Sequence, residues 1–94
     1  MKRADVIHTI LSAIITLVSE ANQERDNNPR EYKLRNHYIS QALGMYGTLQ
    51  IMQAFDDDVM QSLRKAIEDY NTLVIYFISE NKIKPFKRGV SSDE

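Results

Sequence analysis

Carboxylates and imidazoles are the side chains of this sequence with the clearest potential for metal or acid–base chemistry. Asp56, Asp57 and Asp58 are consecutive, and carboxylate oxygens are ligands that Ca²⁺ and Mg²⁺ prefer. A calcium loop, however, needs oxygen ligands at alternate positions around a glycine and a closing glutamate, and this pattern does not follow. His8 and His37 have no acidic or histidine neighbour at a metal-binding spacing. The sequence therefore predicts no metal site.

Catalytic motifs are also missing from the sequence. No nucleophile is spaced with a base, no glycine-rich phosphate loop is present, and no paired carboxylates mark a cleft. Cysteine is absent, which excludes disulfides and thiolate metal sites and suits a reducing cytoplasm. We therefore expect a cytoplasmic protein that is not an enzyme, binds no cofactor and has no small-molecule substrate.

Length and charge restrict the fold further. A chain of 94 residues has room for one domain, and at this size it buries roughly 60–65% of its extended surface. The formal net charge of −1 argues against a generally basic nucleic-acid binder. Because the residue before a proline is pushed out of helical geometry, Pro85 ends any preceding helix. We expect one helical domain over residues 1–83 and a flexible tail over residues 84–94.

The chain is organised around an apolar pattern between residues 59 and 77. Apolar residues recur there at alternating spacings of three and four, the period of a helix with one buried seam. This pattern predicts a helix over 56–81 with Ile67 and Tyr70 deeply buried near its middle. The residues of the seam are Met60, Leu63, Ile67, Tyr70, Val74 and Phe77.

Two earlier segments are predicted to pack on this helix. Residues 4–24 are apolar over an arc of about 200° with a continuous polar remainder, which favours a helix over a strand. Residues 29–54 form the next helix, with Asn28 as N-cap, Pro29 in the first turn and Glu31 completing a capping box. Three long helices joined by short connections predict an all-α, up-down-up bundle.

Four residues do not fit the core-facing pattern of these helices. Ile75 and Tyr76 project away from the seam of the third helix. Gly44 and Gly47 lie on the polar side of the second, where each costs up to about 1 kcal/mol relative to alanine. Such glycines indicate either a tolerated bend or the close approach of a neighbouring backbone.

The apolar arcs of the first two helices are wider than one neighbour each can cover. A monomer would expose a contiguous apolar patch larger than soluble monomers usually show. We therefore expect the bundle to be completed by a twofold homodimer with the first helix at its centre. The candidate interface residues are Ile7, Leu11, Ile15 and Val18.

Charge is predicted to be unevenly distributed along the bundle. In an up-down-up topology the first connection and the C-terminus share one end. With their acidic neighbours, the basic residues there leave about four net positive charges. Such an end favours an acidic protein or a nucleic-acid backbone as partner, although cations near a helix C-terminus are also favoured by the helix dipole alone. The residues of this basic end are Arg25, Arg30, Lys33, Arg35, Lys82, Lys84, Lys87 and Arg88.

The N-terminal segment shares one feature with a targeting signal, which is a pair of basic residues before an uncharged run. Lys2 and Arg3 precede an uncharged run over residues 6–19, but fourteen residues are too few to span a bilayer and no cleavage site follows. The narrow polar side of this helix carries hydroxyls and acids rather than Lys or Arg, which argues against attachment to a membrane surface. We expect no membrane contact.

These observations favour one function over its rivals. The leading hypothesis is a small helical protein that acts through protein–protein interaction, with a second copy of itself and with a regulatory or inhibitory partner. The alternative is a nucleic-acid-associated regulator that uses the basic end. The sequence resembles no protein family residue by residue.

Overall fold

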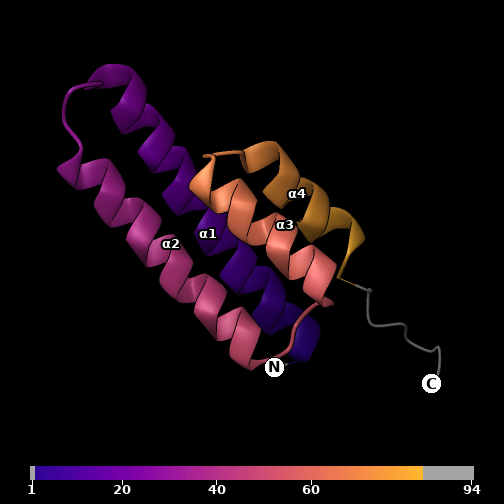
Figure 1. The fold of residues 1–94 in the computed structure, drawn as a ribbon. Helices are drawn as coiled ribbons and strands as arrows, with labels where there is room; N and C mark the ends of the chain where they lie inside the picture. Colours follow the sequence, from indigo (N-terminus) through magenta and orange to yellow (C-terminus); the bar gives the residue numbers. More distant parts are fainter. Residues whose placement is uncertain (1, 84–94) are drawn as a thin grey trace.

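The computed structural model describes residues 2–83, and their secondary structure is entirely helical. Four helices follow one another: α1 (Arg3–Asn27), α2 (Lys33–Ile51), α3 (Asp57–Glu68) and α4 (Thr72–Asn81). The all-α prediction is confirmed, whereas the prediction of three helices is wrong (Figure 1). The predicted flexible tail, residues 84–94, lies outside the described residues.

The first two helices form a long antiparallel hairpin. α1 runs past the predicted end near residue 24, and the backbone N–H of Asn28 closes it on the carbonyl of Glu24 at 2.8 Å. α2 begins later than predicted, because residues 29 and 30 form a turn and residues 31 and 32 precede the helix. The predicted capping box is wrong: Asn28 is the C-cap residue of α1, and the N-cap residue of α2 is Tyr32, without a side-chain cap bond. The Glu31 carboxylate accepts from the N–H of Lys33 at 3.0 Å.

The predicted third helix is two helices separated at residues 69–71. The N–H of Asn71 bonds to the carbonyl of Ala66 at 2.7 Å, and that of Tyr70 bonds to Ile67 at 3.2 Å. This pair of bonds, with Tyr70 at a φ of 60°, is a Schellman ending. The side chain of Asn71 then accepts from the N–H of Val74 at 3.3 Å and caps α4. One asparagine thus starts a new helix where the apolar pattern alone predicts continuation.

This break changes which side of α4 faces the core. The deep burial predicted for Ile67 is confirmed, and the exposure of Tyr76 is also as predicted. Tyr70 is only half-buried, because the turn carries it out of the helix. Ile75, predicted to point outward, is completely buried, whereas Phe77, predicted in the seam, is 56% exposed. A helical period of about 100° per residue cannot be carried across a left-handed residue.

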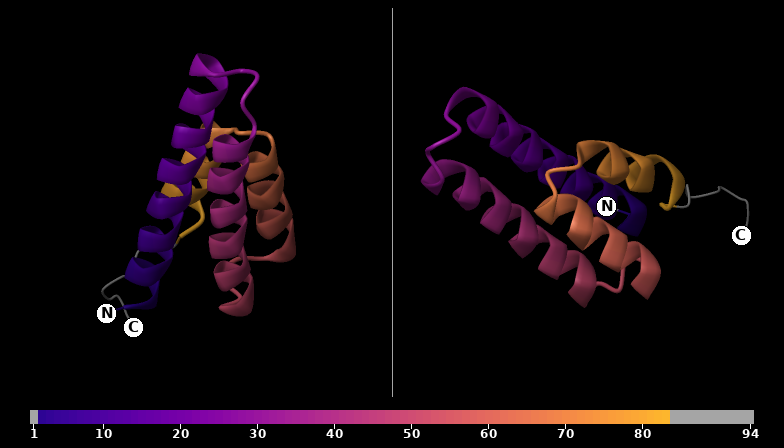
Figure 2. Two further views of the ribbon diagram at one scale, coloured as in Figure 1. Left: turned by 90° about the vertical axis from the view of Figure 1, so that its left-hand side faces the viewer. Right: turned by 45° about the horizontal axis from the view of Figure 1, so that its top comes forward.

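The four helices enclose one core. α1 packs on α2 and α4, and α3 packs on the same two helices from the other side. The α3–α4 hairpin covers only part of the longer α1–α2 hairpin, so the molecule is elongated, at 52 × 23 × 21 Å (Figures 1 and 2). The N-terminus of α1 and the C-terminus of α4 lie at the same end, because four helices make an even number of passes.

The candidate dimer residues lie mostly inside this core. Ile7, Leu11 and Val18 are buried, and Ile15 is half-buried against the same cluster. The fourth helix covers the apolar side of α1 that a three-helix bundle would leave to a second copy. Burial within one chain leaves the first three side chains almost no surface for a partner. Self-association stays a prediction, but it needs another surface.

Both glycines of α2 lie in open surroundings. A Cβ atom added at Gly44 or Gly47 would meet nothing within 4 Å. Within the described residues, therefore, no backbone approaches them closely, and the structure gives neither glycine a packing role.

Asn22 of α1 fixes the position of the α3–α4 turn. Its Nδ2 donates to the carbonyl oxygen of Tyr70 at 3.0 Å, while its Oδ1 is buried without a partner among the described residues. We expect Asn22→Asp to destabilise the fold by about 1–3 kcal/mol, because a carboxylate cannot donate to that carbonyl. Thermal unfolding followed by circular dichroism measures this loss. The loss of stability should shrink on acidification, since a protonated carboxyl regains a donor. A loss that does not depend on pH would contradict the role of Asn22 as donor to the Tyr70 carbonyl.

Candidate interaction surface

The structure does not bring Lys82 to the predicted basic end. Lys82 follows α4 and lies beside the start of α1, so it is at the opposite end of the molecule from the α1–α2 connection. The added reversal at residues 69–71 is the reason. Lys84, Lys87 and Arg88 lie outside the described residues.

The basic residues that remain near the α1–α2 connection are partly engaged within the chain. Arg25 lies 3.7 Å from the carboxylate of Asp26 and 5.1 Å from the ring centroid of Tyr70. Arg35 donates to the carbonyl of Pro29 at 3.2 Å and lies over the ring of Tyr32 at 4.6 Å. The acidic residues Glu20, Glu24 and Asp26 lie in the C-terminal part of α1, near this end. The separation from Lys82 lowers the positive charge that the described residues gather at this end, and a nucleic-acid backbone as partner stays a prediction.

Those acidic residues also perturb a tyrosine. Tyr38 is half-buried on α2, and its pKa is raised above the ordinary value of 10.0. Burial is the largest cause, followed by the negative charge of Glu20, a hydrogen bond to Glu20 and the charge of Glu24. A raised pKa means that the folded state favours the neutral phenol. Its contribution to stability is present below the unfolded pKa and is lost only when the pH rises through the folded value, in strongly alkaline solution.

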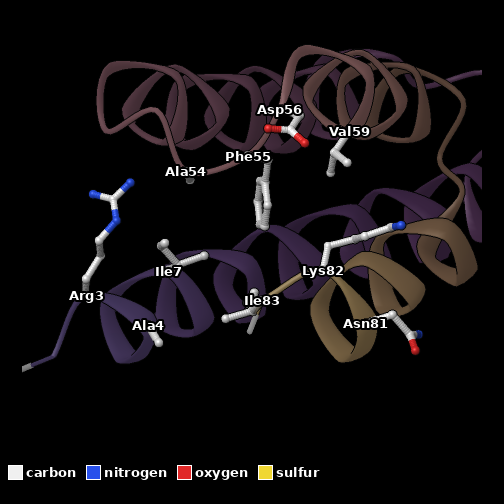
Figure 3. A pocket seen from close by; sticks show the side chains of 10 residues that line it. All are labelled: Arg3, Ala4, Ile7, Ala54, Phe55, Asp56, Val59, Asn81, Lys82 and Ile83. Atoms are coloured by element: carbon white, nitrogen blue, oxygen red, sulfur yellow. The ribbon is translucent and has the colours of Figure 1, made fainter. Parts of the chain in front are cut away.

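A cavity of about 670 Å³ opens at the end where α1 starts and α4 ends. Figure 3 shows the ring of Phe55 among its walls, between the segment that precedes α3 and the start of α1. Arg3 is already engaged there, because its guanidinium donates to the carbonyls of Met52 and Gln53 at 2.6 and 3.1 Å and caps the C-terminus of α2. Asp56 is the only carboxylate among the lining residues.

The charged side chains of the cavity lining are few. They are the carboxylate of Asp56, the amine of Lys82 and the guanidinium of Arg3, which is already bonded to two carbonyls. Across residues 2–83, His, Asp and Glu nowhere gather in a group of three that could hold a metal ion. The cavity therefore offers a mixed polar and apolar surface.

The most unusual surface lies on α4. Residues 73–78 are six consecutive apolar residues, so the helix is apolar on every side. Ile75, Ile78 and Ser79 face the core and are buried, whereas Leu73, Tyr76 and Phe77 are 79%, 53% and 56% exposed. A helix that is apolar all round is normally covered all round.

The exposed residues share one side of the helix. Leu73, Tyr76 and Phe77 occupy positions i, i+3 and i+4, which places their side chains together. Glu80 lies one further turn along the same side and is exposed. We call these four residues the α4 outer face. Lys82 lies at its C-terminal end, with its Nζ 5.9 Å from the ring centroid of Phe77.

Other exposed apolar residues do not form a comparable group. Ile51 is 86% exposed at the end of α2, and Tyr32 is 59% exposed in the connection before α2. Scattered single residues of this kind are normal on soluble proteins. A shallow hollow of about 570 Å³ between α1 and α2 is lined by small and apolar residues, including Ala13, Leu17 and Gly44. On α2 Leu34 is also exposed, at 40%, but it lies far along the helix from Ile51. Among residues 2–83, only the α4 outer face brings three large exposed apolar side chains together on one side of a helix.

Sequence reasoning missed this surface because it placed Leu73 and Phe77 on the core side. Two signals were present. Asn71 is a good N-cap residue immediately before the apolar run, and the run itself is too continuous for a helix with one buried side.

Comparison with known proteins identifies no relative: no family model, no curated protein and no solved structure matches the chain.

The length and composition of α1 bear on the predicted absence of membrane contact. The expectation that this segment is too short to span a bilayer does not hold for the whole helix, which is long and apolar enough by length and composition alone. The core helix of a soluble protein and a signal sequence meet the same criterion. In this fold the most apolar side of α1 lies in the core between α2 and α4.

Proposed function

We propose that this chain is a protein-binding helical domain and that the α4 outer face is its docking surface. The observation that carries the proposal is the 79% exposure of Leu73 at the N-terminal end of that face. Burying a leucine side chain is worth about 1.5–3 kcal/mol relative to leaving it exposed. Two aromatic rings beside it add large apolar area that a partner can cover.

The spacing of these residues supports a helix-mediated interaction. Partners that bind an amphipathic helix commonly contact side chains at i, i+3, i+4 and i+7. Leu73, Tyr76, Phe77 and Glu80 occupy these four positions in order. The anchors are held on a helix whose other side is fixed in the core by Ile75 and Ile78. A docking helix that is already folded loses little conformational entropy when it binds.

Site-specific photo-crosslinking tests this proposal. A benzoylphenylalanine replaces Tyr76 in one variant and Tyr32 in a matched control, because the two tyrosines are 53% and 59% exposed. Both proteins are expressed in the native host and irradiated. We expect discrete protein adducts from position 76 and none from position 32. Adding Leu73→Asp to the first variant should remove the adducts, because it replaces the most exposed apolar side chain of the face with a charge.

Two results would contradict the proposal. One is equal crosslinking at both positions, which indicates non-specific contact with any exposed ring. The other is the absence of adducts at position 76 while the protein remains folded by circular dichroism.

A further inference from the structure

We infer that the first partner of the α4 outer face is a second copy of the same chain, packed antiparallel about a twofold axis between Tyr76 and Phe77. This inference rests on the proposed function, because it assigns the partner of the same surface. α4 lies at the outside of the molecule along its whole length (Figures 1 and 2). Leu73 and Tyr76 are open to solvent on this side, whereas the flexible side chain of Lys82 approaches the ring of Phe77, with its Nζ 5.9 Å from the ring centroid.

The positions of the anchors suit this symmetry. In a twofold antiparallel pair, each residue before the axis faces the residue equally far after it on the other copy. Tyr76 therefore faces Phe77 of the second copy, and two aromatic pairs form at the centre. Leu73 faces the aliphatic stem of Glu80 of the second copy, about 10 Å along the helix from its own Glu80. One set of side chains is thus complementary to itself.

Charge selects the antiparallel direction over the parallel one. The first turn of α4 contains no acidic residue, so the positive end of the helix dipole has no negative side chain within that turn. Glu80 lies in the last turn and makes no hydrogen bond or ion pair with the described residues. Antiparallel packing brings the Glu80 carboxylate of each copy to the N-terminal end of the other α4. Parallel packing would instead place the two carboxylates beside each other.

The available area indicates a weak dimer. Two convex helix faces with three large apolar side chains each bury less than the roughly 1,200–2,000 Å² of a stable interface. An interface of this size forms transient complexes. We therefore expect a dissociation constant on the order of 100 µM. Monomer and dimer then exchange at concentrations that are accessible to measurement.

Sedimentation velocity between about 10 and 500 µM tests the inference, since this range brackets the expected constant. The wild-type chain should shift from the 10.9 kDa monomer towards twice that mass. Leu73→Asp should weaken association by at least about tenfold, because it removes an apolar contact and places a carboxylate opposite Glu80 of the second copy. Ile51→Asp is the matched control: it replaces a residue that is 86% exposed but lies on α2, and it should leave association unchanged.

A second variant tests the direction of packing. Glu80→Lys should weaken association about threefold or more, because it places a positive charge at the positive end of the partner helix. An unchanged constant for Glu80→Lys would overturn the antiparallel arrangement. Equal weakening by Ile51→Asp and Leu73→Asp would overturn the assignment to α4.

The failure of this inference is distinguishable from the failure of the proposed function. A wild-type chain that remains monomeric at about 500 µM overturns the second copy as partner. If position 76 nevertheless crosslinks to proteins of another mass, the docking surface stands and its partner is a different chain. If position 76 yields no adduct either, the proposed function fails as well. Adducts with twice the mass of the chain support both.

Discussion

Replacing Ile75 with alanine is expected to lower the free energy of unfolding by about 2–5 kcal/mol, as large-to-small changes in a protein core do. Ile75 is completely buried, and its removal leaves a cavity between α4 and the rest of the core. Leu73→Ala, only two residues away, is expected to change stability by about 0.5 kcal/mol or less because Leu73 is mostly exposed. Chemical denaturation at low protein concentration measures both.

This pair of substitutions distinguishes the observed fold from a continuous third helix. In a continuous helix over 56–81, Leu73 belongs to the core-facing arc and Ile75 points outward, so the two effects would be reversed. A larger loss for Leu73→Ala than for Ile75→Ala would contradict the break at residues 69–71. Similar melting behaviour of both variants would contradict the assigned side of α4.

Leu11→Lys is expected to have a still larger effect and to prevent folding at every protein concentration. Leu11 is fully buried in the middle of α1, at the centre of the core. An unpaired ammonium group in such a site costs several kcal/mol, a large part of the roughly 5–15 kcal/mol that stabilises a small domain. Ser12→Lys is the matched control, because Ser12 is exposed on the polar side of the same turn. Circular dichroism and thermal unfolding report both variants.

The outcome for Leu11→Lys also decides which surface mediates self-association. A folded Leu11→Lys monomer that no longer dimerises would return the interface to α1, as the width of its apolar arc predicts. If Leu11→Lys is unfolded at both low and high protein concentration while Ser12→Lys is folded, Leu11 lies in the core of the single chain.

Much of the fold follows from the sequence for identifiable physical reasons. The apolar period between residues 60 and 67 lies within one uninterrupted helix, and Met60, Leu63 and Ile67 are buried as the pattern predicts. Asp56 is the N-cap residue of α3, with Asp57 and Asp58 in its first turn, where the helix dipole favours negative charge. These features are local, and local spacing is sufficient to predict them.

The errors arise where a short-range contact overrides the apolar period. Tyr70 adopts a positive φ that non-glycine residues rarely occupy, at a cost of about 1–2 kcal/mol. The Schellman bonds, the cap from Asn71 and the bond from Asn22 hold it there. No glycine marks this turn, so the usual signal of a helix end was absent.

The candidate surfaces depended on that one turn. An additional reversal moved Lys82 away from the α1–α2 connection and brought α4 over α1, which covered the predicted dimer residues. It also turned Leu73 and Phe77 outward. The sequence therefore misplaced Lys82, Leu73 and Phe77 for a topological reason, although most helical residues were assigned correctly. A single missed turn changes both the end and the side on which later residues lie.

Thiol labelling of single-cysteine variants tests the orientation of α4 most directly, and the chain suits it because it contains no cysteine of its own. Leu73→Cys, Ile75→Cys, Tyr76→Cys and Phe77→Cys are labelled under native conditions, at micromolar concentration where the weak dimer dissociates. Our account predicts that positions 73, 76 and 77 react within about tenfold of the rate of an unfolded peptide, and that position 75 reacts at least about 100-fold more slowly. Fast labelling at positions 75 and 76 with protection at 73 and 77 would contradict it, because α4 would then present the opposite side to solvent.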